Sequence, residues 1–296
     1  MRAHLNRRAV LVASASAASA ALFPGFPQAS EAGEDITRRL GELEKLTGGR
    51  LGVAVRAFDG DAGFGHRESE RFAMCSTFKA LAAACVLKRA DEGKERLDRR
   101  IVYGNGALVP YSPITEKFAG KEGMTLEGIC EAAITLSDNT AGNLLLDVIG
   151  GPAALTQWLR ETGDAETRLD RIEPDLNEAK KGDPRDTTTP QAMLATLGRL
   201  ALGDVLSESS RQRLVDWMVE TRTGDARLRA GLPKDWRAGD KTGTSATGAA
   251  SDIAIAWPPG RGPVVIAVYI AEATAPVKEL NPVFAEVGAL IGSFTL

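Results

Sequence analysis

The sequence predicts a mixed α/β protein, in which an antiparallel sheet is flanked by the N- and C-terminal helices and carries an inserted all-helical lobe. Three observations lead to this prediction. Strand-like apolar runs lie near both chain ends, at 51–58, 252–257 and 264–270. Residues 76–220 instead show helical periodicity, interrupted by Gly, Pro and Asp. Helix-like segments precede the first strand and follow the last. A crevice between the two lobes is the expected place for a site.

The elements of the sheet lobe are read from apolar spacing and turn residues. Residues 36–46 repeat apolar side chains at the helical period, and a glycine pair ends that helix. The strand-like run 51–58 is followed by Asp59-Gly60, a pair typical of hairpin turns. Near the other end, a Pro-Pro-Gly turn separates the last two strands, and 281–292 is the expected closing helix.

The inserted lobe is expected to consist of helices joined by short breaks. The segment 126–136 is amphipathic, and Gly150-Gly151-Pro152 ends the helix that follows it. The segments 190–200 and 207–219 predict two more amphipathic helices.

Residues 1–30 predict an export signal. Arg2, Arg7 and Arg8 precede an apolar run rich in Ala and Ser, which is too short to span a bilayer comfortably. The arginine pair resembles a twin-arginine signal, and cleavage is expected near residues 29–32. Residues 31–296 then form the mature domain. Its sheet lobe is expected at about 31–70 plus 221–296, and its helical lobe at about 71–220.

Composition excludes several classes of function. The chain of 296 residues is 44% hydrophobic and 25% charged, which is ordinary for a globular protein. Its net charge of −3 offers no attraction for nucleic acid or an anionic membrane. It has only two histidines, His4 and His66. A Ser-His-Asp triad would rest on His66 alone, and a His-rich metal site is excluded. We expect no metal and no cofactor, and a catalytic base that is Lys, Asp or Glu.

The stretch Cys75-Ser76-Thr77-Phe78-Lys79 reads S-x-x-K and opens an apolar helical run at 80–87. Residues three apart share one face of a helix, so the Ser76 hydroxyl would lie beside the Lys79 amine. Free N–H groups and the helix dipole in the first turn favour negative charge there. The alternative is an ordinary capping serine with a surface lysine.

Three other stretches are ambiguous when each is taken alone. Ser137-Asp138-Asn139 lies at a corner between helices and could be a helix cap. Lys241-Thr242-Gly243-Thr244 lies in the sheet region and could be an edge strand, although the glycine suggests a close backbone approach. The irregular stretch from Arg171 to Asp186 could be held at its ends by these two residues, or they could form a weak surface pair.

Together, and in this order, the motifs S-x-x-K, S-D-N, E-x-x-L-N (Glu173 to Asn177) and K-T-G resemble those of the class A β-lactamases. This family belongs to the penicillin-recognising serine enzymes, and the resemblance covers about residue 31 to the end. It implies a periplasmic enzyme that hydrolyses penicillins, and by expectation cephalosporins, and so confers antibiotic resistance. It also implies that the mature protein is a monomer and does not stay bound to a membrane.

The resemblance assigns roles to the motif residues. Ser76 would be the nucleophile, with an oxyanion hole from the backbone N–H groups of Ser76 and Thr244. Lys79, or Glu173 acting through water, would take the Ser76 proton, and a Lys241 charge nearby would lower the pKa of Lys79. Ser137 would protonate the departing ring nitrogen. Glu173 would activate the water that deacylates the enzyme.

The remaining roles that the resemblance implies concern substrate binding and the irregular loop. The residues expected to bind substrate are Tyr111, Asn139, Asn177, Arg227, Lys241, Thr242, Gly243 and Thr244. Arg171 and Asp186 would hold the loop, and Pro174 would keep Glu173 out of a regular helix. Many relatives have an arginine where this chain has Ala250, and Arg227 is expected to replace it.

Family disulfides are not expected here. In the relatives that have these bridges, the resemblance implies that the partner of Cys75 would be at the position of Ser245, and the partner of Cys130 at the position of Ala83. We therefore predict that Cys75, Cys85 and Cys130 are free thiols. Arg227 with Thr244 resembles a carbapenem-hydrolysing subset, but the missing Cys75 bridge speaks against that activity. Ser245 suggests activity on cephalosporins.

Two alternatives share the motifs. A penicillin-binding DD-peptidase or esterase has the Ser and Lys groups but lacks a positioned base such as Glu173. A β-lactam sensor domain would be attached to a membrane helix, and no second apolar run of about 20 residues is present.

Overall fold

The computed structural model describes residues 31–294 except Asp59 and Asp61. The predicted export signal at 1–30 and one residue of the predicted Asp59-Gly60 turn lie outside the described residues. Within the described part, no helix has the length and apolar character needed to cross a membrane.

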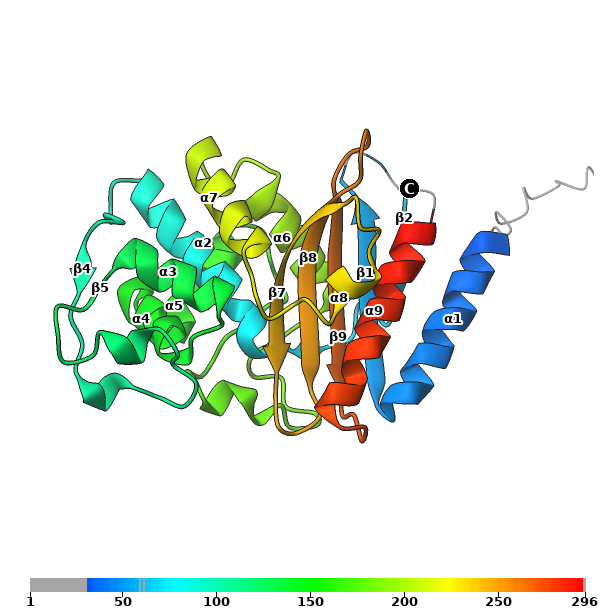
Figure 1. The fold of residues 1–296 in the computed structure, drawn as a ribbon, viewed down its shortest axis with the longest axis horizontal. Coiled ribbons are helices and arrows are strands. Elements are labelled where there is room, and N and C mark those ends of the chain that lie inside the picture. Colours follow the sequence, from blue (N-terminus) through cyan, green and yellow to red (C-terminus); the bar gives the residue numbers. More distant parts are fainter. Residues whose placement is uncertain (1–30, 59, 61, 295–296) are drawn as a thin grey trace, which may run out of the picture.

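A five-stranded antiparallel sheet forms the centre of the molecule (Figure 1). Its strands, in spatial order, are β2 (Gly63–His66), β1 (Arg50–Ala57), β9 (Val264–Ala271), β8 (Ala250–Trp257) and β7 (Arg237–Thr244). Strands from the two ends of the chain therefore pair directly, β1 with β9. The predicted fold class is confirmed.

Short strands form two further pairs. These are β3 (Phe72–Ala73) with β6 (Thr187–Thr188), and β4 (Arg100–Ile101) with β5 (Met124–Thr125). The α-helices are α1 (Glu31–Thr47), α2 (Phe78–Asp91), α3 (Leu126–Thr135), α4 (Asn139–Ile149), α5 (Pro152–Glu161), α6 (Pro190–Ala201), α7 (Glu208–Val219), α8 (Leu228–Gly231) and α9 (Val277–Ser293). Single 3-10 turns are η1 (Cys75–Thr77), η2 (Asn105–Ala107), η3 (Thr115–Lys117) and η4 (Asp175–Glu178).

The strand β9 is buried along its whole length because both faces of the sheet are covered. Alternate side chains of a strand point to opposite faces. Val264, Ile266, Val268 and Ile270 pack in one core with α1 and α9. Val265, Ala267 and Tyr269 belong to the other core, which contains α2 to α7. One central strand therefore contributes to both hydrophobic cores.

The helices divide between the two faces of the sheet, as Figure 1 shows. The terminal helices α1 and α9 lie side by side on one face. On the other face, α6 packs against β1 and β9, and α7 packs against β7. These two helices come from the segment 71–220, so part of that segment covers the sheet while α2 to α5 extend away from it.

The helix α2 connects the sheet to the helical lobe. Its residues 78–87 are all buried, because α3, α4, α5 and α7 surround it. A helix that is apolar on all sides is expected in such a position. The helix begins directly after η1, and η1 packs against β7 and β8. The fold therefore brings the S-x-x-K motif at the start of α2 against the edge strand that carries K-T-G.

Candidate active site

A cavity of about 330 Å³ lies where η1, the corner before α4, the loop around η4 and the strand β7 meet. Its lining consists of Ser76, Tyr111, Ser137, Asn139, Asn177, Thr223, Arg227, Thr242, Gly243 and Thr244. All of these except Thr223 were predicted site residues. The fold thus gathers residues from six separate stretches of the sequence around one cavity.

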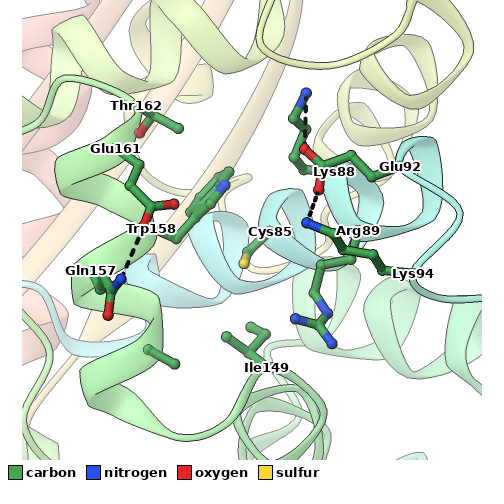
Figure 2. A pocket seen from close by; sticks show the side chains of 11 residues that line it. Cys85, Lys88, Arg89, Glu92, Lys94, Ile149, Gln157, Trp158, Glu161 and Thr162 are labelled. Atoms are coloured by element: carbon green, nitrogen blue, oxygen red, sulfur yellow. Dashed lines mark hydrogen bonds and ion pairs between the residues drawn. The ribbon is translucent and has the colours of Figure 1, made fainter.

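A second hollow of about 430 Å³ lies between the C-terminal half of α2 and α5 (Figure 2). It is lined by side chains such as Cys85, Arg89 and Trp158, and includes none of the predicted site residues. Its charged groups largely pair among themselves, since Lys94 contacts Glu92 at 2.7 Å. The cavity at the N-terminal end of α2 is therefore the candidate active site.

Ser76 lies in η1, one turn before α2 proper, rather than in the first turn of the α-helix itself. The residue before it, Cys75, has a φ of 47°, which is rare for a residue with a side chain. The Ser76 hydroxyl is 3.0 Å from Lys79 Nζ and 3.2 Å from Glu173 Oε1. Such strained backbone concentrates at functional sites, and here it accompanies a serine with both an amine and a carboxylate in contact.

Lys79 is fully buried, and its Nζ has four oxygen neighbours. It donates to Ser76 Oγ at 3.0 Å, to the Ser137 carbonyl at 2.8 Å and to Asn139 Oδ1 at 2.6 Å, and it lies 3.0 Å from Glu173 Oε1. Burial lowers the pKa of Lys79, and the Glu173 charge opposes this. The direction agrees with the prediction, but burial is the main cause, not the charge of Lys241 as predicted.

Ser137 links the two buried lysines. Its carbonyl accepts from Lys79 at 2.8 Å, and its hydroxyl accepts from Lys241 Nζ at 2.9 Å. The φ of Ser137 is 57°. Burial lowers the pKa of Lys241 well below its usual value, and the positive charge of Lys79 lowers it further. A hydroxyl held beside a buried amine in this way can relay a proton.

The capping role at this corner belongs to Asp138, not to Ser137. The Asp138 carboxylate accepts from the backbone N–H of Ala141 at 2.9 Å and so caps α4. It also accepts from the backbone N–H and the hydroxyl of Thr115, at 3.0 and 2.8 Å. This leaves the Ser137 hydroxyl free to face the cavity. Tyr111, whose φ is 64°, stands exposed at the rim.

Glu173 is buried and held at both its backbone and its carboxylate. The side chain of Asn143 accepts from the Glu173 N–H at 2.8 Å and donates to its carbonyl at 2.9 Å. Asn177 Nδ2 lies 2.5 Å from Glu173 Oε2. The peptide bond from Glu173 to Pro174 is cis, and η4 follows it. The second carboxylate oxygen therefore faces Asn177 while the first faces Ser76 and Lys79.

The irregular loop is closed by an ion pair that is largely buried, rather than by a surface pair. Arg171 Nε donates to Asp186 Oδ2 at 2.6 Å, and the Asp186 side chain is 1% exposed. Asp186 Oδ1 accepts from the backbone N–H groups of Asp170 and Arg171 at 2.8 and 2.9 Å. The Asp186 carbonyl accepts from Met74 N–H at 2.9 Å. The loop that carries Glu173 is thereby anchored next to η1.

Gly243 explains how β7 approaches η1 so closely. A Cβ atom at this position would lie 2.7 Å from the Met74 carbonyl and 3.0 Å from the Cys75 Cβ. A side chain would therefore push the strand away from the nucleophile. The glycine of the K-T-G motif allows Thr242 and Thr244 to reach the cavity wall beside Ser76.

Arg227 lies behind β7 and is buried. Its Nη1 donates to the carbonyls of Gly243 at 2.9 Å and Ser251 at 2.6 Å, and its Nη2 donates to Thr244 Oγ1 at 2.7 Å. Burial lowers the pKa of Arg227. The guanidinium therefore supports the end of β7 and holds the Thr244 hydroxyl at the cavity.

Ser245, at the position where some relatives have a disulfide cysteine, makes hydrogen bonds instead. Ser245 Oγ donates to the Asn177 carbonyl at 2.5 Å and lies 2.7 Å from Thr247 Oγ1. These contacts join the end of β7 to the loop that carries Glu173. The three cysteines are free and buried, which confirms that prediction.

Two site residues were missed by sequence reasoning. Asn143 lies one turn after the S-D-N motif, where it reads as an ordinary polar helix residue. Thr223 lies in the turn after α7, and its hydroxyl is 2.6 Å from the Thr242 hydroxyl. Neither belongs to a motif, and their roles depend on contacts with residues far away in the sequence. Among the described residues, no cluster of His, Cys, Asp or Glu is arranged to hold a metal ion.

Comparison with known proteins gives consistent matches along the described chain. The model of the β-lactamase enzyme family matches residues 35–294. β-lactamase L2 of Stenotrophomonas maltophilia is 48% identical over 249 residues, which are 84% of this chain and 82% of the relative. β-lactamase AST-1 of Nocardia asteroides is 49% identical over 252 residues, or 84% of this chain and 80% of the relative.

Solved structures also match the fold of this chain. An ancestral class A β-lactamase (GNCA) has a TM-score of 0.86 and 62% sequence identity, and the match covers 87% of this chain and 99% of that chain. A second structure, described as the last common ancestor of Gram-negative bacteria (GNCA4) class A β-lactamase, has a TM-score of 0.86 and 60% identity, covering 87% and 98%.

Proposed function

The chain belongs to the class A β-lactamases, serine hydrolases of the β-lactam amide, and we propose that it works through an acyl-enzyme on Ser76 that is hydrolysed by water activated by Glu173. The observation that carries this proposal is the contact set of the Ser76 hydroxyl. It lies 3.0 Å from a buried amine and 3.2 Å from a buried carboxylate that also contacts Asn177.

In the acylation step, Ser76 Oγ forms a bond to the β-lactam carbonyl carbon, and the carbon–nitrogen bond of the ring breaks. Two groups are close enough to take the Ser76 proton, Lys79 Nζ and Glu173 Oε1. Burial lowers the pKa of Lys79, which favours the neutral amine that a proton acceptor must be. Ser137 would then give its proton to the departing nitrogen, and Lys241 at 2.9 Å would support that transfer.

The oxyanion of the tetrahedral intermediate would be bound by the backbone N–H groups of Ser76 and Thr244. Support comes from the close approach of β7 to η1 at Gly243, where there is no room for a Cβ atom. The start of α2 also favours negative charge near Ser76.

In the deacylation step, Glu173 would take a proton from water, and the hydroxide would attack the ester carbonyl carbon. The bond from that carbon to Ser76 Oγ would then break, and the proton that Glu173 took from water would pass to the serine oxygen. Asn177 lies 2.5 Å from Glu173 Oε2 and could hold the same water. The two backbone hydrogen bonds from Asn143 fix the position of Glu173.

The substrate carboxylate would meet the hydroxyls of Thr242 and Thr244, in the positive field of Lys241 and Arg227. Asn139 would accept from the side-chain amide of the substrate. Its Oδ1 already accepts from Lys79 at 2.6 Å and has a second lone pair available. Tyr111 would form a wall of the entrance.

We also propose that the protein is exported to the periplasm, where it acts as a monomer and confers β-lactam resistance. The family match begins at residue 35, after the basic and apolar segment 1–30. Activity on penicillins and cephalosporins is expected, and a kinetic panel that adds a carbapenem would define the range of substrates.

The test compares the protein, without residues 1–30, with a Glu173→Ala variant. We expect the parent to turn over nitrocefin catalytically, with no loss of rate when zinc is chelated. The variant should bind one equivalent of penicillin covalently on Ser76 and release it about 10³-fold more slowly, a difference to be followed by intact-protein mass spectrometry. A parent that is acylated stoichiometrically without turnover would instead behave as a penicillin-binding protein, and the proposal would be wrong.

A further inference from the structure

Thr223 is the one residue of the cavity lining that was not predicted from the sequence. It lies in the turn between α7 and α8. The residues before it fix this turn, because Thr221 Oγ1 donates to the Asp240 carbonyl at 2.8 Å and Arg222 N–H donates to the Thr135 carbonyl at 3.0 Å. The Thr223 hydroxyl is thereby held 2.6 Å from the Thr242 hydroxyl.

The hydrogen bond of the neighbouring Thr244 shows why the direction of donation matters. A threonine hydroxyl has one proton to donate, whereas a guanidinium can only donate. Arg227 Nη2 lies 2.7 Å from Thr244 Oγ1, so Thr244 must accept in this contact. The Thr244 proton is thus free to point elsewhere, and the cavity is where an anion could accept it.

Thr242 also has a single hydroxyl proton, but its partner Thr223 can either donate or accept. Either hydroxyl of the pair can be the donor. If Thr242 donates to Thr223, its lone pairs are left for the cavity and repel an anion. If Thr223 donates to Thr242, the single Thr242 proton is available to a carboxylate. A carboxylate in the cavity therefore selects the second arrangement.

We propose that Thr223 is a positioning residue for carboxylate-bearing β-lactams, acting through Thr242. It donates to Thr242 Oγ1 and so directs the Thr242 proton at the substrate carboxylate. Together with the arrangement of Arg227 and Thr244, this gives the cavity two oriented hydroxyl donors on one edge of β7. The inference rests on the proposed function and identifies the anionic group of the substrate as what this edge recognises.

The test uses benzylpenicillin and its methyl ester with three variants, Thr223→Val, Thr223→Ala and Thr223→Ser. Valine keeps the shape of threonine without the hydroxyl, and serine keeps the hydroxyl. We expect Thr223→Val and Thr223→Ala to lower kcat/KM for the acid about tenfold, the effect of one hydrogen bond to a charged group. Thr223→Ser should stay within about twofold of the parent.

The methyl ester separates this role from a packing role. Since the ester has no anionic carboxylate, its kcat/KM should be the same in the parent and in Thr223→Val. The proposal is wrong if the acid is turned over equally well by the parent and Thr223→Val, or if the ester loses as much as the acid. Failure of the proposed function would look different, because the parent protein itself would then hydrolyse neither compound. Thermal unfolding of each variant checks that the fold is retained.

Discussion

The two buried lysines determine the chemistry available at the scale of single residues. Lys79 and Lys241 are both completely buried, and each contacts a different atom of Ser137. Burial is the first cause of the lowered pKa at both positions. The sequence identified both residues and their motif context. The reason for the shift could not be read from it, because burial depends on what packs around the amine.

The cysteines give a prediction at the same scale. Burial raises the pKa of Cys75 and Cys85 to about 12, and that of Cys130 still higher. Since the thiolate is the reactive form, we expect the native protein at pH 8 to release almost no thionitrobenzoate from Ellman's reagent within minutes. In guanidinium chloride, all three thiols should react.

A Cys85→Ser variant provides the control for this thiol titration. It should lose one equivalent in the denatured state and change nothing in the native state. Cys85 lies at the wall of the hollow in Figure 2, so it is the thiol that Ellman's reagent would reach most easily. Prompt reaction of one native thiol that disappears in the variant would contradict the assigned burial.

At the scale of elements, the loop between Arg171 and Asp186 has an anchoring that its sequence did not determine. The sequence indicated a long irregular stretch with a charged residue at each end. In the structure, the pair closes the loop from inside, and Asp186 also binds backbone N–H groups at its base. An exposed charge pair contributes little to stability, whereas removing one partner of a buried pair leaves an uncompensated charge and is strongly destabilising.

One carboxylate of α1 contacts both β1 and β2. Glu44 accepts from Arg67 Nε at 2.6 Å, from His66 Nε2 at 3.1 Å and from the Leu51 N–H at 3.1 Å. Hydrogen bonding to Arg67 is the main cause that lowers the pKa of Glu44 to about 2. We expect Glu44→Gln to lower the free energy of unfolding at pH 7 by about 1–2 kcal/mol, measured by urea denaturation.

The pH dependence of that loss follows from the direction of the shift. The folded pKa lies below the unfolded value, so the carboxylate stabilises the fold above about pH 4.5, and this contribution is lost as the pH falls toward 2. The difference between the parent and Glu44→Gln should therefore shrink between pH 5 and pH 3. Glu34→Gln, an exposed change on the same helix, should show no such trend. A difference that stays constant with pH would mean that the charge is not responsible.

At the scale of the whole molecule, one sheet belongs to both hydrophobic cores. Alternate residues of β9 enter the core with α1 and α9 or the core with α2 to α7. We therefore expect the two lobes to unfold together. Loss of nitrocefin turnover and loss of far-UV circular dichroism should coincide in urea.

Leu40→Ala tests this coupling from the face opposite the site. Leu40 is completely buried in the core with α1 and α9, so the change should cost about 2–5 kcal/mol. At 25 °C, the folded variant should keep its kcat, while the urea midpoints of both probes decrease together. Two separate transitions in the variant would show that the lobes unfold independently.

The sequence by itself determined the family, the order of elements and the principal chemical groups. Motifs such as S-x-x-K and K-T-G record constraints between neighbouring residues, and apolar spacing records which faces are buried. These patterns involve residues that are close together in the sequence, and so they can be recognised from one sequence alone.

Only the tertiary structure decided how those groups are arranged. It showed that β7 meets η1 at Gly243, that burial lowers the pKa of Lys79, and that Asn143 and Thr223 contact motif residues. Each of these depends on residues far apart in the chain that come within hydrogen-bond or van der Waals distance after folding. Desolvation and hydrogen-bond direction are properties of that packing, and a sequence pattern contains no record of them.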